Sequence, residues 1–507
     1  MSVVNFYKQG QMLTRRGKYG EAIACYEKAL AVNPNDTNAI FALGNVAKKM
    51  GLSDVAEKMF RATLALLPDS MEAASNLGTL LIDLERIEEA IAIYQGILAN
   101  HPENAETWLN IAIAVKKNGD LEKAEIFTRE SLRLKPKYAA AHVSLSEILF
   151  SQNNLDGAME AIDKAWRLDK KNGRIRYNRS EFLLASGALE EGWREMDYGL
   201  QRYEGRVTHY HHKLKRWNGE TLEGKSILLS GEQGLGDQIR YINCIPDILE
   251  KAARVVIETE PRLVNLMART FPKAEVHPID CSRITDTWNF NYDWPVNKLD
   301  YASPMLNLFR FFRGDITDFP SPAVTIVTDP DEQEKWHKRV TDKATDNATD
   351  NAKGLKIGLC WRSGVSTLAR GTHAVDLLAM APILGLKGVS FFSLMYSDCK
   401  EECAMVKDQL GVDIITFDDL DYKNDMEAVF ALSKEMDIMV SCTSTPFSIT
   451  AAVGIPTYLM LPFPLWQSLG TDYMPMEPSV IPYTQQTAGD WSDVAEKIAA
   501  KINKDWL

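Results

Sequence analysis

Small apolar residues and prolines recur at a fixed interval along the first two fifths of the chain. Both sets keep a step of 34 residues: Ala22, Ala56, Ala90, Ala124 and Ala158, and Pro34, Pro68, Pro102 and Pro136. This period is typical of helix–turn–helix repeats, which stack into an array that presents a binding surface to a partner. It predicts five repeats and a degenerate sixth, over 3–36, 37–70, 71–104, 105–138, 139–172 and 173–206.

The residue types within each repeat follow from helix packing. A small residue recurs where the two helices of a repeat approach closely: Gly10, Gly44, Gly78, Ala112, Ser146 and Ser180. Tyr26, Phe60 and Tyr94 are expected to fill the gap to the next repeat. Each proline ends a second helix, because proline cannot continue the hydrogen-bond ladder. This is the tetratricopeptide (TPR) pattern, and the sixth unit, with Gly192-Trp193, is predicted to be a cap or an adaptor.

The pattern changes to strand–loop–helix units after residue 224. The apolar strand 225–230 is followed by a glycine loop, 231–237, and then by an apolar helix; the strand 254–258 and the helix 263–270 come next. This alternation predicts a parallel sheet. Gly234 and Gly236 let the backbone approach a ligand at a helix start, although the loop is neither a GxGxxG nor a Walker A motif. The polar segment 342–353 is predicted to be a flexible hinge or loop.

A second α/β unit is predicted beyond the hinge. Its expected strands are 356–361, 389–394, 413–416, 437–441 and 457–460, and a helix over 491–502 closes the chain. Thr443, Ser444 and Thr445 lie between a strand and the apolar helix 447–453. Hydroxyls and free backbone N–H groups at such a junction favour a diphosphate, and they equally suit ordinary helix capping.

These patterns divide the chain into four parts. They are the TPR domain 1–206, a linker 207–224, an N-terminal acceptor-side Rossmann-like domain 225–350, and a C-terminal donor-binding Rossmann-like domain 355–507. His209, His211 and His212 cluster in the linker, where a solvated surface is favoured over a zinc site. The fold class is therefore α (a TPR superhelix) followed by α/β, with a paired Rossmann-type, GT-B-like arrangement.

Charge and cysteine usage narrow the functional classes. The net charge of the 507 residues is −12, which argues against a nucleic-acid partner, because phosphate contacts require a basic face. No apolar run is long enough to span a membrane, and no signal segment is evident. None of the seven cysteines forms a CxxC pair, and Cys399 and Cys403 share a helix face without a further nearby metal ligand. We expect reduced thiols and a cytoplasmic location.

Several motifs of the second half together resemble one family. They are Trp217-Asn-Gly-Glu, the loop Gly231-Glu-Gln-Gly-Leu-Gly-Asp237, Cys360-Trp-Arg-Ser-Gly364, Asp419-Leu-Asp421 with Asn424-Asp425, Thr443-Ser-Thr445, Gly454-Ile-Pro456, Trp466-Gln-Ser-Leu-Gly470 and Gly489-Asp-Trp491. The chain resembles bacterial TPR proteins whose C-terminal domain is similar to the family-9 glycosyltransferases, the ADP-heptose:lipopolysaccharide heptosyltransferases. Some relatives glycosylate flagellin, and the layout is similar to that of the protein O-GlcNAc transferases.

The resemblance implies roles for particular residues. Asp237 would be the general base, although it could simply cap its helix. Arg362, together with Arg370 and Lys356, would stabilise the leaving diphosphate, and Ser363 shares the Arg362 motif. The resemblance also implies that Thr443, Ser444 and Thr445 bind the phosphates of the donor. Asp425 would either orient the donor sugar or cap a helix.

The second phosphate loop departs from the family pattern. Many relatives carry an Asp-Thr pair and a histidine where this chain has Thr443, Ser444 and Ser448, which leaves the donor open. Asp419 and Asp421 have metal-ligand spacing but fit the family's turn, so no metal and no cofactor is expected. The favoured function is a metal-independent inverting glycosyltransferase that moves a sugar from a nucleotide sugar to a protein held by the TPR array, with flagellin as one candidate. The alternatives are a lipopolysaccharide or other glycan acceptor, and a non-catalytic adaptor.

Overall fold

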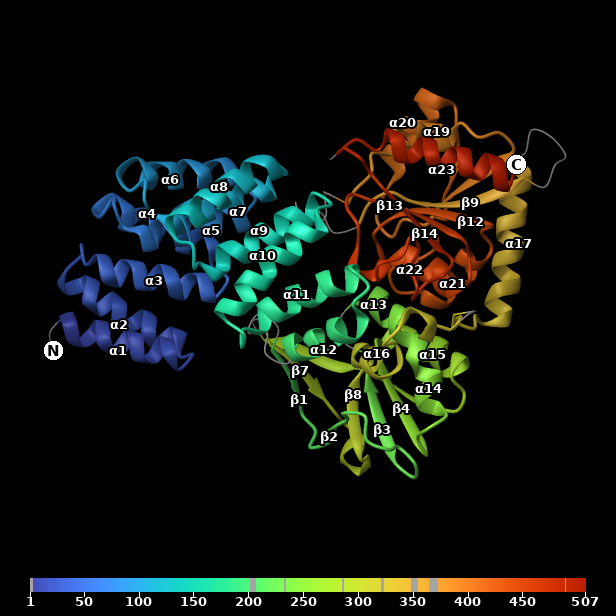
Figure 1. Cartoon of the computed structure of the whole chain (residues 1–507), viewed down its shortest axis with the longest axis horizontal. Helices are drawn as coiled ribbons and strands as arrows, with labels where there is room; N and C mark the ends of the chain where they lie inside the picture. Colours follow the sequence, from blue (N-terminus) through green and yellow to red (C-terminus); the bar gives the residue numbers. More distant parts are fainter. Residues whose placement is uncertain are drawn as a thin grey trace. The chain divides into compact units, whose positions relative to one another are not determined.

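The structure is a computed structural model that describes residues 3–200, 207–231, 234–284, 287–320, 323–347, 354–363, 373–487 and 489–507 (Figure 1). The chain forms two compact units, Met1–Leu168 and Asp169–Leu507. The fold class is the one that the sequence predicts, because a helical repeat array is followed by parallel α/β sheets.

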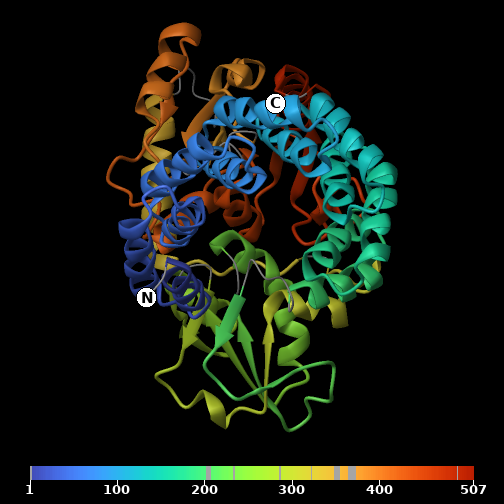
Figure 2. The ribbon, with the colours of Figure 1, turned by 90° about the vertical axis from the view of Figure 1, so that its left-hand side faces the viewer.

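The first unit consists of helix pairs that follow one another along a curved array (Figure 2). The helices are α1 Val3–Arg15, α2 Tyr19–Val32, α3 Thr37–Lys49, α4 Ser53–Leu66, α5 Met71–Asp83, α6 Ile87–Asn100, α7 Ala105–Lys117, α8 Leu121–Leu134, α9 Ala139–Ser151 and α10 Leu155–Leu168. Asp36, Ser70 and Asn104 each lie two residues after a repeat proline and cap the next first helix by accepting backbone N–H groups.

The glycines on the first helices make room for aromatic rings of their own repeat. A Cβ atom on Gly78 would lie 2.2 Å from Cζ of Tyr94, and one on Gly44 would lie 2.6 Å from the ring of Phe60. The sequence placed these rings in the gap to the next repeat. Each ring also lies against the glycine of its own helix pair, because only a missing side chain leaves enough space there.

The degenerate sixth helix pair belongs to the second unit. The helices α11 Gly173–Ala185 and α12 Leu189–Leu200 contribute to the core of the α/β unit. Trp193 is buried, its indole N–H donates to the Arg313 carbonyl at 2.8 Å, and its ring lies against Phe309 and Trp466. Gly192-Trp193, which breaks the repeat pattern, thus forms a contact with the α/β layers.

The first parallel sheet has the order β2-β8-β3-β4-β5. Its strands are β2 Lys215–Arg216, β8 Tyr301–Pro304, β3 Ser226–Ser230, β4 Arg254–Thr259 and β5 Glu275–Pro278, and its helices include α13 Leu235–Arg240, α14 Ile245–Leu249 and α15 Val264–Thr270. A small separate sheet is formed by β1 Val207–Tyr210, β7 Thr287–Asn291 and β6 Asp280–Ile284. The predicted linker therefore begins as a strand that includes His209.

The second parallel sheet has the order β11-β10-β9-β12-β13-β14. Its strands are β9 Leu355–Cys360, β10 Val389–Ser393, β11 Ile414–Ile415, β12 Ile438–Cys442, β13 Thr457–Leu461 and β14 Val480–Thr484, with helices α20 Lys400–Leu410, α21 Met426–Lys434, α22 Thr445–Ala452 and α23 Ser492–Asp505. In chain order this is 3-2-1-4-5-6, the arrangement of dinucleotide-binding doubly wound sheets.

The predicted hinge is partly helical. Helix α17 spans Pro330–Asn347, so residues 342–347 continue a helix, and residues 348–353 lie outside the described part. Trp336 and Val340, one turn apart, are buried in the core of the second sheet. This apolar stripe anchors the helix despite the polar composition of its end. Within the described residues, no helix is long and apolar enough to cross a membrane.

Candidate functional site

The candidate site lies at the carboxyl ends of β9 and β12. These strands are neighbours, with Ser441 paired with Cys360, and the strand order reverses between them. The segment Trp361–Ser363 leaves β9 at this edge and the turn Thr443–Thr445 leaves β12 beside it. Doubly wound sheets bind their ligands at such a point, because the connections diverge to opposite faces and leave a crevice.

The turn Thr443–Thr445 presents polar groups at the start of α22. The three residues are half-buried, whereas Pro446 to Ala452 are buried. Ser444 occupies the N-cap position, but its side chain makes no capping bond to the helix; its hydroxyl lies 3.2 Å from Sγ of Cys360. Simple capping therefore does not account for Ser444, and the helix start keeps its attraction for an anion.

His373 lies against this turn. Its Nδ1 is 2.7 Å from the hydroxyl oxygen of Thr443, and its half-buried ring packs edge-on against Phe463. The sequence did not single out this histidine. An imidazole is therefore present at the turn although the turn itself carries none. The only sequence signal was its position shortly after β9, which becomes informative once β9 and β12 are known to be adjacent.

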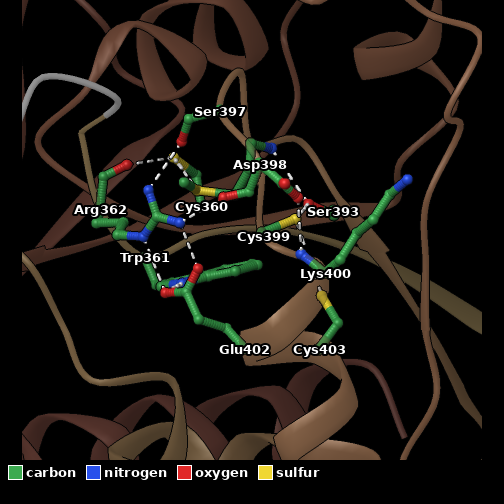
Figure 3. Close-up of polar contacts among 11 residues, drawn as sticks. Cys360, Trp361, Arg362, Ser393, Ser397, Asp398, Cys399, Lys400, Glu402 and Cys403 are labelled. Carbon is green, nitrogen blue, oxygen red and sulfur yellow. Dashed lines mark hydrogen bonds and ion pairs between the residues drawn. The ribbon is translucent and has the colours of Figure 1, made fainter.

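Arg362 has protein partners (Figure 3). Its Nε donates to Oε1 of Glu402 at 2.8 Å, Nη2 also contacts Glu402, and the remaining bonds go to the Ser397 hydroxyl and the Asp398 carbonyl. Glu402 is the largest cause that raises the pKa of Arg362. The guanidinium charge is thus compensated without a ligand, and the role of Arg362 towards a diphosphate stays a prediction.

The other positions implied by the resemblance have different environments. The Ser363 hydroxyl lies 2.9 Å from that of Tyr396 at the same edge of the sheet, and Arg370 lies outside the described residues. Lys356 is near the amino end of β9, about 13 Å of extended chain before Cys360, so the expectation that it contacts a diphosphate is wrong. Asp425 caps α21 by accepting from the Ala428 N–H at 3.1 Å.

The acidic pair considered for metal binding is engaged by neighbouring side chains. Asp419 accepts from Arg339 at 2.6 Å, and Asp421 accepts from the Asn424 amide at 2.8 Å. Across the described ranges, no group of three or more His, Cys, Asp or Glu side chains could hold a metal ion.

Asp237 is the last residue of the glycine loop and lies in the first turn of α13. Its side chain is 38% exposed, and its Oδ1 lies 3.7 Å from Nη1 of Arg240. A Cβ atom on the neighbouring Gly236 would lie 3.8 Å from Cα of Thr445 and 3.5 Å from the Ser448 hydroxyl. The glycine loop of the first sheet therefore meets the hydroxyl-rich turn of the second sheet.

Arg240 links α13, which follows a strand of the first sheet, to segments that follow strands of the second sheet. Its buried guanidinium lies 3.1 Å from Glu477 and 3.5 Å from the Ser448 hydroxyl. Burial opposes the charge, but Glu477 and Asp237 together raise the pKa of Arg240. One turn later, the buried Asn243 amide donates to the Met476 carbonyl at 2.7 Å. Helix α13, and with it Asp237, is thereby held against α22 and against residues 476–477, which connect β13 to β14.

A buried carboxyl group lies beside the glycine loop. Glu258 is the penultimate residue of β4 and has no exposed surface, and its carbonyl accepts from the Gly231 N–H at 2.7 Å. Burial raises the pKa of Glu258 to about 7, against hydrogen bonds from Ser230 and Tyr292 that lower it. The sequence predicts a strand over 254–258 but gives no reason to assign a role to Glu258.

Comparisons with known proteins identify the array. Family models described as TPR repeat or tetratricopeptide repeat match residues 10–51, 41–105 and 81–145, which indicates a role in protein interaction. Protein FlbA of Caulobacter vibrioides (strain ATCC 19089 / CIP 103742 / CB 15) is 28% identical over 383 residues, 74% of this chain, and the match spans 63% of FlbA.

Solved structures resemble about a third of the chain. A thermophilic TPR protein of Thermus thermophilus has 24% identity and a TM-score of 0.32, covering 36% of this chain and 100% of its own. PilW, described as a type IV pilus biogenesis factor, has 23% identity and a TM-score of 0.35, covering 38% of this chain and 90% of its own. YrrB, described as a TPR protein with an unusual peptide-binding site, has 21% identity and a TM-score of 0.28, with coverage of 33% and 87%.

Proposed function

We propose that the chain is a metal-independent, inverting glycosyltransferase that uses a nucleotide-sugar donor and a protein acceptor recruited by its TPR array. One observation carries the proposal: the glycine loop bearing Asp237 meets the turn Thr443–Thr445, since Gly236 packs against Thr445. A potential base and an anion-binding helix start thus come from different sheets and lie at one junction.

The donor diphosphate would lie at the start of α22. Hydroxyls of Thr443 and Thr445 and the imidazole of His373 surround this helix start, whose dipole favours negative charge. These groups would stabilise the charge that develops on the leaving diphosphate, the role that a metal has in other enzymes. Positioning of the two substrates would supply a further part of the rate.

Asp237 would act on the acceptor. Its carboxylate takes the proton of the acceptor hydroxyl while the oxygen forms a bond to the anomeric carbon. The bond from that carbon to the diphosphate oxygen breaks, and the electron pair leaves with the diphosphate. Attack from the side opposite the leaving group inverts the anomeric configuration. The partial exposure of Asp237 leaves its carboxylate accessible to such a hydroxyl.

The acceptor side rests on the repeat array. TPR arrays present a surface for peptides or proteins, and a flagellin-like protein is the acceptor that the sequence resemblance favours. A second reading, a non-catalytic donor-binding adaptor, is favoured by one observation: the Arg362 charge is already neutralised by Glu402. The experiment below separates the two.

The test measures donor binding and transfer in the same set of variants. Titration calorimetry with nucleoside diphosphates should show that Thr443→Val and His373→Gln each weaken binding about tenfold or more, the effect of losing one hydrogen bond to a charged group. His337→Gln is the matched control, because this histidine lies on α17 with its side chain 67% exposed. Asp237→Asn should retain donor binding and abolish the mass increase of a co-expressed flagellin-like acceptor.

The outcomes distinguish the glycosyltransferase from the adaptor. The donor site is refuted if the wild type, Thr443→Val and His373→Gln bind nucleoside diphosphates with equal affinity. It is also refuted if the wild type binds no nucleoside diphosphate. Donor binding without transfer to protein or to lipopolysaccharide by the wild type leaves the adaptor. Transfer to lipopolysaccharide alone refutes the protein acceptor. Full transfer by Asp237→Asn removes Asp237 from the mechanism.

A further inference from the structure

Two thiols lie together at the start of α20, beside the Arg362–Glu402 ion pair. Cys399 is the N-cap residue of α20 and Cys403 is in the first turn of that helix. Their Sγ atoms are 3.9 Å apart, and Figure 3 shows Cys399, Glu402 and Cys403 together at the start of the helix. Cys399 is buried and Cys403 is half-buried, so the pair borders the protein surface. The resemblance assigns no role to either residue.

We propose that Cys399 and Cys403 are a reversible oxidation site that forms an intramolecular disulfide with peroxide. Residues four apart on a helix have Cα atoms about 6 Å apart, within the range that a disulfide spans. The sulfur atoms must approach by about 2 Å to reach the bond length. The required adjustment falls on the helix start, where Cys399 already has non-helical dihedral angles (φ −137°, ψ 14°).

The environment of Cys399 makes it the attacking thiol. The hydrogen bond from Cys403 has the largest effect and lowers the pKa of Cys399 to about 7. The Ser393 hydroxyl also lowers this pKa, whereas burial raises it. A thiolate is therefore present near neutral pH.

The Cys399 thiolate attacks a peroxide oxygen, which gives a sulfenic acid and releases water. The Cys403 sulfur then attacks this sulfenic sulfur, and a second water leaves as the disulfide forms. The two thiols lose two electrons and two protons overall, and hydrogen peroxide is reduced to two waters; a dithiol reductant reverses the step by exchange.

Closure of this disulfide would act on the segment that leaves β9. Glu402, between the two cysteines, accepts from the Trp361 indole at 2.8 Å and from Arg362. The Asp398 carbonyl, directly before Cys399, accepts from Arg362 at 2.6 Å. A shift of the first turn of α20 therefore displaces the groups that hold Trp361 and Arg362. If the proposed donor site is correct, oxidation weakens donor binding.

The first arm of the test needs no substrate. The full chain is treated with stoichiometric hydrogen peroxide, alkylated and mapped by mass spectrometry. The expected result is a mass loss of two hydrogens and one peptide cross-link between Cys399 and Cys403, both reversed by dithiothreitol. Cys281→Ser, which removes an exposed single thiol, should still form the cross-link, whereas Cys403→Ser and Cys403→Ala should not. Full alkylation of both thiols after peroxide, or a cross-link elsewhere, overturns the proposal.

The second arm measures nucleoside diphosphate binding before and after oxidation. The oxidised wild type should bind about tenfold more weakly, as for the loss of one charged hydrogen bond, and Cys403→Ser should be unaffected by peroxide. Formation of the disulfide with unchanged affinity refutes its coupling to Arg362. If the reduced protein binds no nucleoside diphosphate, the proposed function fails while the first arm still decides whether the disulfide forms.

Discussion

Removal of the buried charge of Arg240 should destabilise the second unit strongly. The side chains of Arg240 and Glu477 are 7% and 6% exposed, and Oε1 of Glu477 has no hydrogen-bond partner among the described groups. Arg240→Met would leave the Glu477 carboxylate buried without its cation. Breaking a buried ion pair in this way costs about 3–5 kcal/mol, whereas replacing both partners by apolar residues is often close to neutral.

Urea unfolding followed by tryptophan fluorescence measures this cost. All tryptophans except Trp108 and Trp166 lie in the second unit, so the signal reports mainly on that unit. Arg240→Met should lower its free energy of unfolding by about 3–5 kcal/mol, and Arg240→Met/Glu477→Leu should recover most of the loss.

The matched control is a surface pair. Arg254 and Glu275 are 49% and 42% exposed at 2.5 Å, so Arg254→Met should cost at most about 1 kcal/mol. A loss in Arg240→Met no larger than the loss in Arg254→Met would refute the reasoning. So would a double variant that is as unstable as Arg240→Met, because the cost would then come from lost packing rather than from an unpaired charge.

Two further predictions concern Glu258 and the repeat packing. Because burial raises the pKa of Glu258 from 4.5 to about 7, the folded state holds this proton more tightly than the unfolded state; the associated stability is complete below pH 4.5 and is lost as the pH rises through 7. Glu258→Gln should therefore stabilise the second unit at pH 8 by up to about 3 kcal/mol relative to its effect at pH 4.5. Urea unfolding at the two pH values measures the free energy of unfolding of the variant and of the wild type. An equal effect of the substitution at pH 4.5 and at pH 8 would exclude a raised pKa of Glu258. Gly78→Ala should destabilise the array by about 1–3 kcal/mol, because the added Cβ overlaps Tyr94. Gly96→Ala should stabilise the array by about 0.5–1 kcal/mol, because a Cβ there has nothing within 4 Å. Urea unfolding followed by circular dichroism measures both free energies of unfolding, and a change in the same direction for the two variants would contradict this reasoning.

The sequence predicts the elements whose periodicity reflects a local constraint. The array could be predicted because each repeat must place a small residue against the neighbouring helix at the same point. The central strands β9, β12 and β13 could be predicted because strands buried on both faces are short continuous apolar runs.

The elements that the sequence does not predict lack a local hydrophobic pattern, each for a different physical reason. Strand β14 is an edge strand that contains Pro482, and proline is tolerated there because only one side pairs, with β13. Strands β1, β6 and β7 are short and polar, and β1 pairs with β7 across about eighty residues of chain. Helix α17 was not predicted, because the apolar residues that anchor it, Trp336 and Val340, are few and precede a polar segment that favours a hinge or loop.

The candidate site could be predicted only in part, because its chemistry depends on which strands are neighbours. The turn Thr443–Thr445 and the loop containing Asp237 follow from local strand–helix junctions. The contact between His373 and Thr443 does not, because 70 residues separate the two positions and other strands and helices lie between them.

Because strand order decides which residues meet, a motif residue that is missing from the turn can be supplied by another segment of the chain. In the turn and the helix that follows it, Thr443, Ser444 and Ser448 stand where many relatives carry an Asp-Thr pair and a histidine, and the local sequence therefore favours a lost site. Adjacent strands lie about 4.8 Å apart, so a residue that follows β9 can reach the end of β12. His373 reaches it, and an imidazole is present beside Thr443 although the motif position is a serine. The absence of a motif residue therefore does not establish the absence of its chemical group at a topological switch point, where two chain segments share one edge. For this chain, the effect of His373→Gln on donor binding is accordingly the sharper test of the site than any substitution within the turn.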